Sequence, residues 1–123
     1  MFSKILDLFK GNKTASGDIM EKIKKLAENR DEAKLLKLSK NEDPDIRAAV
    51  VKALRHVRTD ACYNRVIEAL KDEIPAVRIA ASEVLGEMGI PKSNDALRYA
   101  LAKEKDPEAL AAIKKALLDI KEF

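Results

Sequence analysis

The sequence predicts an all-α protein in which pairs of antiparallel helices stack into an α-α solenoid. Ala, Glu, Lys, Leu and Arg, the residues that lose least free energy in a helix, make up more than half of the 123 residues, whereas aromatic residues make up 4%. Pro44, Pro75 and Pro107 recur at intervals of 31 and 32 residues. A repeat of that length built from two helices is typical of a solenoid.

Each of these prolines is predicted to start a long helix. Proline fits the first helical turn, where its missing N–H removes no hydrogen bond. Asp43 and Asp106 stand immediately before two of the prolines and are good N-caps. Gly89 and Pro91 are predicted to end the middle helix. Apolar residues follow each proline with the 3.6-residue period of one buried helix face, which predicts long helices over 44–57, 75–88 and 107–121, and a less regular one over 18–29.

A second, shorter kind of helix is predicted between the long ones. Val66, Ile67 and Leu70 form a core triplet. Its equivalents are Leu97, Arg98 and Leu101 31 residues later, and Leu35, Leu36 and Ser39 31 residues earlier. Asp60 and Ser93 are the expected N-caps of two of these helices. The predicted short helices cover 3–10, 32–41, 60–72 and 93–104.

The repeats predict a single domain over 1–123. Residues 18–121 form the stacked repeats, residues 11–17 form a flexible loop rich in Gly, Ser, Asn and Thr, and residues 1–10 form a capping helix. Docking of that helix on a membrane or a partner is the alternative to capping. Its apolar stripe consists of Phe2, Ile5, Leu6 and Phe9.

Charge and cysteine content narrow the class of protein. The net charge is +3 and the two signs alternate along the chain, which indicates a mixed polar surface. The single cysteine, Cys62, excludes a disulfide within the chain and fits a reducing compartment. No stretch approaches the about 18 apolar residues of a membrane helix. We therefore expect a cytoplasmic protein, a monomer, with no membrane partner.

Two segments resemble a known repeat family. Residues 43–54 read Asp-Pro-Asp-Ile-Arg-Ala-Ala-Val-Val-Lys-Ala-Leu, and residues 75–86 match more closely. Both resemble the first helix of HEAT-like repeats of the phycobilisome-lyase type. The third copy has Leu110 where the first two have Arg47 and Arg78, as expected of a terminal repeat. The resemblance implies a right-handed α-α superhelix of about four helix pairs, used as a protein-interaction scaffold.

The resemblance also implies that the short helices line a concave face that binds a protein partner. Residues turned away from the core triplets would make this surface, and Tyr and Arg are enriched at binding hot spots. Arg98 falls at a triplet position, so its side chain could instead extend past the last helix pair. Lys71 also lies on the side of the short helices that faces away from the core triplets. The candidate partner-binding residues are Lys34, Lys37, Asn64, Arg65, Glu68, Asp95, Arg98 and Tyr99.

Arg47 and Arg78 occupy the same place in successive repeats. The favoured interpretation is a structural ladder between repeats, because the planar guanidinium can bond a carboxylate and helix-end carbonyls together. The alternative is a pair of anion-binding residues. The carboxylates considered as ladder partners are Asp43, Asp45, Asp60 and Glu73.

No motif in the sequence indicates catalysis, a cofactor or a metal. His56 is the only histidine, and Cys62 has no matching catalytic partner. The sequence therefore predicts a non-catalytic scaffold. One alternative, implied by the resemblance, is an accessory subunit or chaperone-like factor of a bilin-lyase type enzyme. The other, less favoured, is a weak nucleic-acid binder that uses the Lys-rich segment 22–40.

Overall fold

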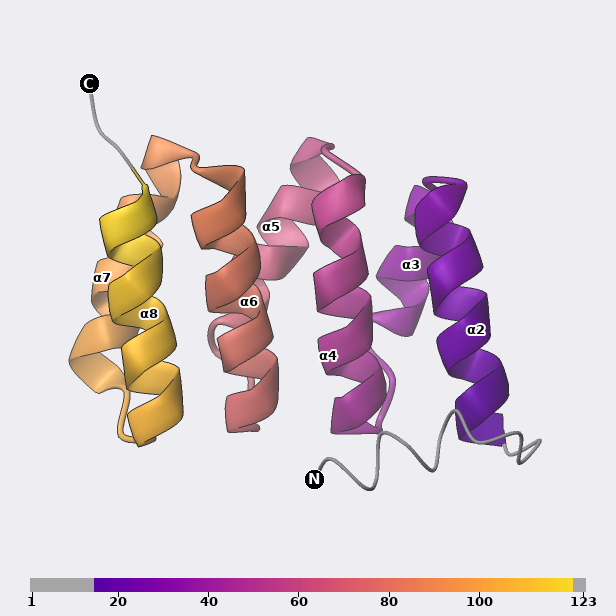
Figure 1. The fold of residues 1–123 in the computed structure, drawn as a ribbon, viewed down its shortest axis with the longest axis horizontal. Helices are drawn as coiled ribbons and strands as arrows, with labels where there is room; N and C mark the ends of the chain where they lie inside the picture. The colour runs from indigo at the N-terminus through magenta and orange to yellow at the C-terminus, as the bar shows by residue number, and fades with distance from the viewer. Residues whose placement is uncertain (1–14, 121–123) are drawn as a thin grey trace.

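The computed structural model describes residues 15–120, and within that range every regular element is a helix. Long and short helices alternate along the chain. In Figure 1 the long helices lie side by side in one layer and the short helices form a second layer behind them. This confirms the predicted all-α solenoid of helix pairs. The long helices are α2 (Ala15–Glu28), α4 (Pro44–Ala53), α6 (Pro75–Met88) and α8 (Pro107–Asp119); the short ones are α3 (Glu32–Leu38), α5 (Asp60–Ala69) and α7 (Asn94–Lys103).

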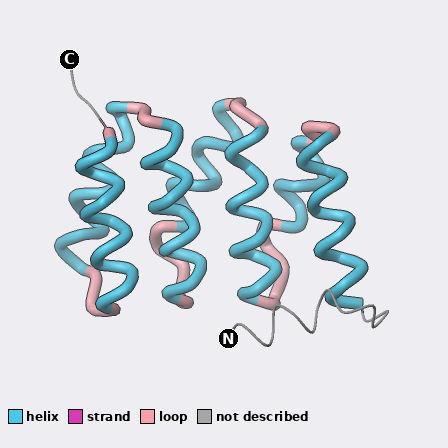
Figure 2. The backbone as a smooth tube through the Cα atoms, in the orientation of Figure 1, coloured by secondary structure: helices cyan, strands magenta, loops and turns pink. Residues whose placement is uncertain are grey.

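Short connections join successive helices, as Figure 2 shows. Two 3-10 turns extend them, η1 (Leu54–His56) after α4 and η2 (Pro91–Ser93) before α7. The predicted capping helix over 1–10 lies outside the described residues. The predicted loop over 11–17 overlaps α2, whose first residue is Ala15.

The prolines start helices as predicted, and the aspartates before them are N-caps. The Asp43 carboxylate accepts a hydrogen bond from the Asp45 N–H at 2.9 Å, and Asp106 accepts one from the Ala109 N–H at 2.9 Å. Gly89 ends α6 with φ +64°, the left-handed conformation predicted for a C-terminal glycine.

The predicted N-caps of the short helices need correction. Thr59 caps α5, because its hydroxyl accepts from the Cys62 N–H at 3.2 Å, and Asp60 is the first helical residue. Ser93 does precede α7, but its hydroxyl makes no capping bond to that helix. It lies 3.1 Å from the hydroxyl of Tyr63, a buried residue of α5.

The ends predicted for α3 and α5 extend too far, to 41 and 72. After the last α-helical residue the chain tightens into turns with bonds between residues three apart. Lys40 and Asn41 donate to the carbonyls of Lys37 and Leu38, and Lys71 donates to that of Glu68. A tightened last turn satisfies helix-end carbonyls without continuing the helix.

The core lies between the two layers and runs along the whole stack. The apolar stripes of the long helices are buried as predicted, with Val50, Val84 and Ile113 fully inaccessible. Leu35, Val66 and Leu97, the first residue of each short-helix triplet, are fully buried against them. The short helices thus close the core that the long helices begin.

The two layers differ in spacing. A Cβ atom on Gly86 of α6 would lie 3.1 Å from the Cα of Ala116 of α8, so these two helices nearly touch. The long helices pack closely along the stack, whereas α5 and α7 make few contacts with each other. The expectation that the short helices line a concave face stays a prediction.

Candidate functional site

The arginine ladder, defined here as the pairs Arg47–Asp72 and Arg78–Glu104, links successive repeats. Nε–H and Nη2–H of Arg47 donate to the two carboxylate oxygens of Asp72 at 2.9 and 3.0 Å. Nη1–H donates to the carbonyls of Asn41 and Glu42, both at 2.9 Å. One side chain of α4 thus bonds the turn before its own helix and the turn after α5.

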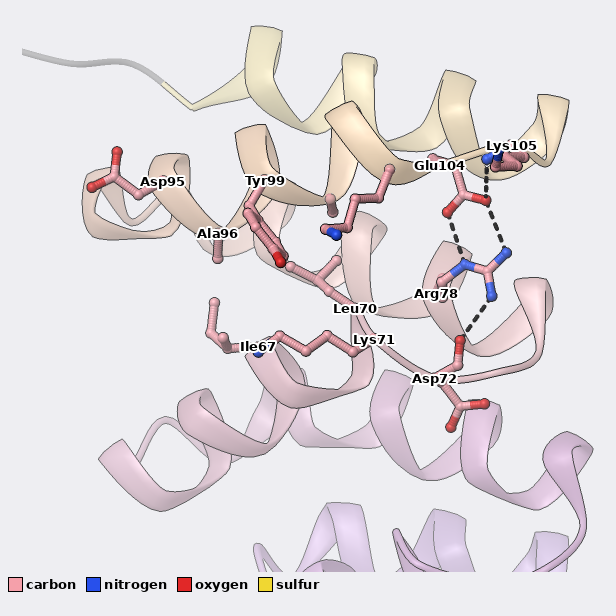
Figure 3. Close-up of a pocket in the computed structure, with 12 residues that line it drawn as sticks. Ile67, Leu70, Lys71, Asp72, Arg78, Asp95, Ala96, Tyr99, Glu104 and Lys105 are labelled. Atoms are coloured by element: carbon pink, nitrogen blue, oxygen red, sulfur yellow. Dashed lines mark hydrogen bonds and ion pairs between the residues drawn. The ribbon is translucent and has the colours of Figure 1, made fainter.

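Arg78 repeats this arrangement one unit later. It donates to both carboxylate oxygens of Glu104 at 2.8 Å and to the carbonyl of Asp72 at 2.7 Å (Figure 3). It also donates to the carbonyl of Glu73 at 3.1 Å. The carboxylates differ from the partners considered from the sequence, which were Asp43, Asp45, Asp60 and Glu73.

A side chain three residues before each repeat proline also accepts a backbone hydrogen bond within the turn that precedes the proline. Asn41, Asp72 and Glu104 each accept a backbone N–H from two residues later, at 2.8, 2.9 and 3.0 Å. Sequence reasoning missed Asp72 and Glu104. Their 32-residue separation, at the same distance before two repeat prolines, was the signal that could have found them.

Both carboxylates of the ladder are stabilised in the charged form. Burial raises the pKa of Asp72, but hydrogen bonds from Arg47 and from the Ile74 N–H outweigh burial and bring that pKa below its usual value. For Glu104 the hydrogen bond from Arg78 is the largest influence, and its pKa is also lowered.

These shifts predict a loss of stability in acid. A carboxyl whose pKa is lower in the folded than in the unfolded chain stabilises the fold above its unfolded value of about 4, and this contribution is lost as pH falls through the folded value. We expect the free energy of unfolding to fall steeply below about pH 4 in chemical denaturation followed by circular dichroism. The Glu104→Gln variant should show a shallower fall, and a slope equal to that of the unmodified chain would contradict this role of Glu104.

A groove of about 860 Å³ lies between α5 and α7 on the short-helix layer. Its apolar lining comes from Ile67, Leu70, Ala96 and Ala100. Tyr99 projects from α7 toward α5 across this space, as Figure 3 shows. The Tyr99 side chain stays 56% exposed although it stands beside an apolar floor.

Charged side chains surround the groove. Lys71, Lys103 and Lys105 line it and are exposed. The Lys103 ammonium lies 5.0 Å from the centroid of the Tyr99 ring, within cation–π range. The Arg78–Glu104 pair closes one end, and Asp95 lies at the other end (Figure 3).

The structure places six of the eight candidate partner-binding residues along two cavities. Asp95 and Tyr99 line the groove between α5 and α7, as does Lys71. Lys34 and Arg98 line neither cavity; both are exposed, and Arg98 lies 3.7 Å from Asp95. A smaller cavity of about 630 Å³ between α3 and α5 is lined by Lys37, Asn64, Arg65 and Glu68.

Arg65 explains why the two cavities differ. Its guanidinium donates to the Ser39 hydroxyl at 2.9 Å and to the Ser39 carbonyl at 3.4 Å, so it bridges α5 to the end of α3. The residue 31 positions later is Ala96, which cannot reach across to α5. The gap that Arg65 bridges in one repeat therefore stays open in the next.

The remaining candidate residues lie away from the groove. His56 is exposed at the end of η1. Cys62 is buried, and burial raises the pKa of its thiol. Over residues 15–120, no three His, Cys, Asp or Glu side chains gather as a metal site would require. The described helices include none with the length and apolar character needed to span a membrane.

Comparison with known proteins identifies the repeat. A family model for HEAT repeats matches residues 32–119, which cover α3 to α8. The search of curated proteins gives no match. Because the matched segment exceeds half of the chain and coincides with the stacked helix pairs, the chain belongs to the HEAT repeat family.

Proposed function

We propose that this chain is a non-catalytic scaffold that binds a segment of a protein partner in the groove between α5 and α7. HEAT repeats are generally protein-interaction scaffolds, which supports the class of function. The sequence placed the binding surface on the short helices, and the proposal keeps that layer. It narrows the surface to the groove between α5 and α7.

The observation that carries the proposal is an exposed tyrosine beside an open apolar groove. Tyr99 and two apolar residues that line the groove, Leu70 and Ala100, offer apolar surface that a partner can bury. Aromatic side chains in such grooves are frequent binding hot spots. The Arg78–Glu104 pair ties the end of α7 to α6. A groove whose walls are already fixed loses little conformational entropy on binding.

The long-helix layer supports this assignment by contrast. Glu21, Lys52, Glu83 and Lys115 occupy equivalent positions in the four long helices and alternate in sign. All four are exposed. Opposite charges at neighbouring positions attract one another, so these four side chains present no excess of one sign to a partner.

The family match does not extend to the phycobilisome-lyase type or to the bilin-lyase accessory role, so both remain expectations from the resemblance. Glu28, Asp31 and Glu32 separate the lysines of segment 22–40 into two groups and lower the net positive charge there, so nucleic-acid binding remains the less favoured hypothesis.

A displayed library of random 16-residue peptides, selected against the folded chain, tests the proposal. We expect enriched peptides that lose binding to the Ala96→Trp variant, because its indole fills the groove. Ala61→Trp, the same substitution on an exposed residue that lines the smaller cavity between α3 and α5, is the matched control and should retain binding. Enriched peptides that bind both variants equally would reject the groove as the site.

A further inference from the structure

We infer that the segment held between α5 and α7 is acidic and amphipathic, with apolar residues on one side and Asp or Glu residues flanking them. This inference rests on the proposed function and adds the chemistry of the partner. Its basis is the balance of charge around the groove.

Two of the three acidic side chains that line the groove are held in short ion pairs. Asp72 pairs with Arg47 at 2.9 Å, and Glu104 pairs with Arg78 at 2.8 Å. The third, Asp95, is exposed and lies 3.7 Å from an Arg98 nitrogen. Asp72 and Glu104 are therefore not available to neutralise the lysines around the groove.

The groove lysines form no ion pair with any side chain of the described range. Lys71 follows α5, Lys103 ends α7 and Lys105 lies in the next turn, so positive charge comes from both walls. Lys71 and Lys103 each stand four residues before a repeat proline, and Lys40 holds the same place in the preceding repeat. Positive side chains on both walls favour a partner with carboxylates along both edges.

The floor between those walls requires apolar side chains from the partner. Ile67, Leu70, Ala96 and Ala100 offer no hydrogen-bonding side-chain group, so a polar residue buried there would lose its water without compensation. Tyr99 supplies one flat aromatic face over this floor. Apolar contact at the centre and carboxylates at the edges together define an acidic amphipathic segment.

To test this inference, the library peptides that bind the unmodified chain but not the Ala96→Trp variant are sequenced. The dissociation constant of the strongest of these peptides is then measured by fluorescence anisotropy. We expect net negative peptides with two or more large apolar residues, and a dissociation constant that rises with salt. The Lys71→Glu/Lys103→Glu variant should weaken binding by about tenfold or more, because each reversal turns attraction into repulsion. The matched control, Lys52→Glu/Lys114→Glu on the exposed face of α4 and α8, should change it by less than about twofold.

The outcomes separate the inference from the proposed function. Groove-dependent peptides that are neutral or basic, or that tolerate both lysine reversals, would overturn the acidic partner while the groove remains a binding site. A selection that yields no groove-dependent peptide would overturn the proposed function and the inference with it. Circular dichroism of each variant confirms that a loss of binding is not a loss of fold.

Discussion

Replacing Arg78 by alanine is expected to lower the free energy of unfolding by about 3 kcal/mol. The Glu104 side chain is 3% exposed and would lose both hydrogen bonds from the guanidinium. A buried carboxylate without its cation is strongly unfavourable. The carbonyls of Asp72 and Glu73 would lose the same donor. Urea denaturation followed by circular dichroism measures the change.

The chain supplies a matched control for this prediction. Arg55 and Glu87 form an ion pair of almost the same length, 2.9 Å, but their side chains are 43% and 55% exposed. Water replaces the lost partner there, so Arg55→Ala should cost less than about 1 kcal/mol. If the two variants lose equal stability, the ladder contributes no more than a surface pair.

Gly86→Val should be the second strongly destabilising substitution, with a loss of about 1–3 kcal/mol. Its Cβ would lie 3.1 Å from the Cα and 3.3 Å from the Cβ of Ala116. The nearest of these atoms is backbone, so α6 and α8 must move apart rather than adjust a side chain. In a chain of this size each kcal/mol lowers the melting temperature by roughly 3–6 °C, which differential scanning calorimetry resolves.

Ala111→Val is the control for Gly86→Val. It adds a branched side chain to an exposed residue of α8, where nothing must move. A change within about 0.5 kcal/mol is expected. Equal melting temperatures for the two variants would show that α6 and α8 are not held at contact distance by small residues.

The sequence predicted the long helices well because their signals are local and repeated. A proline at the first turn, an aspartate before it and an apolar stripe after it all act within one helix, as Pro44 and Asp43 show. The caps of the short helices were less certain, because Thr59 and Asp60 are neighbours and both can cap. Only the backbone geometry decides between them.

The ladder and the groove depend on contacts between repeats, which local patterns do not encode. Arg47 was expected to pair with a carboxylate, but Asp72 lies 25 residues away and meets it only when the helix pairs stack. Likewise Arg65 and Ala96 occupy the same position in successive repeats. Arg65 reaches from α5 to Ser39 at the end of α3, whereas Ala96 lines the open groove between α7 and α5, and this difference appears only when the helix pairs stack. The close approach of α6 and α8 at Gly86 and Ala116 is likewise a contact between repeats.

The central claim is that the groove between α5 and α7 receives a partner segment. Its most direct test is an NMR titration of the ¹⁵N-labelled chain with the strongest groove-dependent peptide. The account predicts that amide shifts concentrate in residues 67–72 and 95–105, with Tyr99 and Ala100 among the largest. Shifts that concentrate instead on the exposed face of the long helices, around Lys52, Glu83 and Lys115, would contradict it.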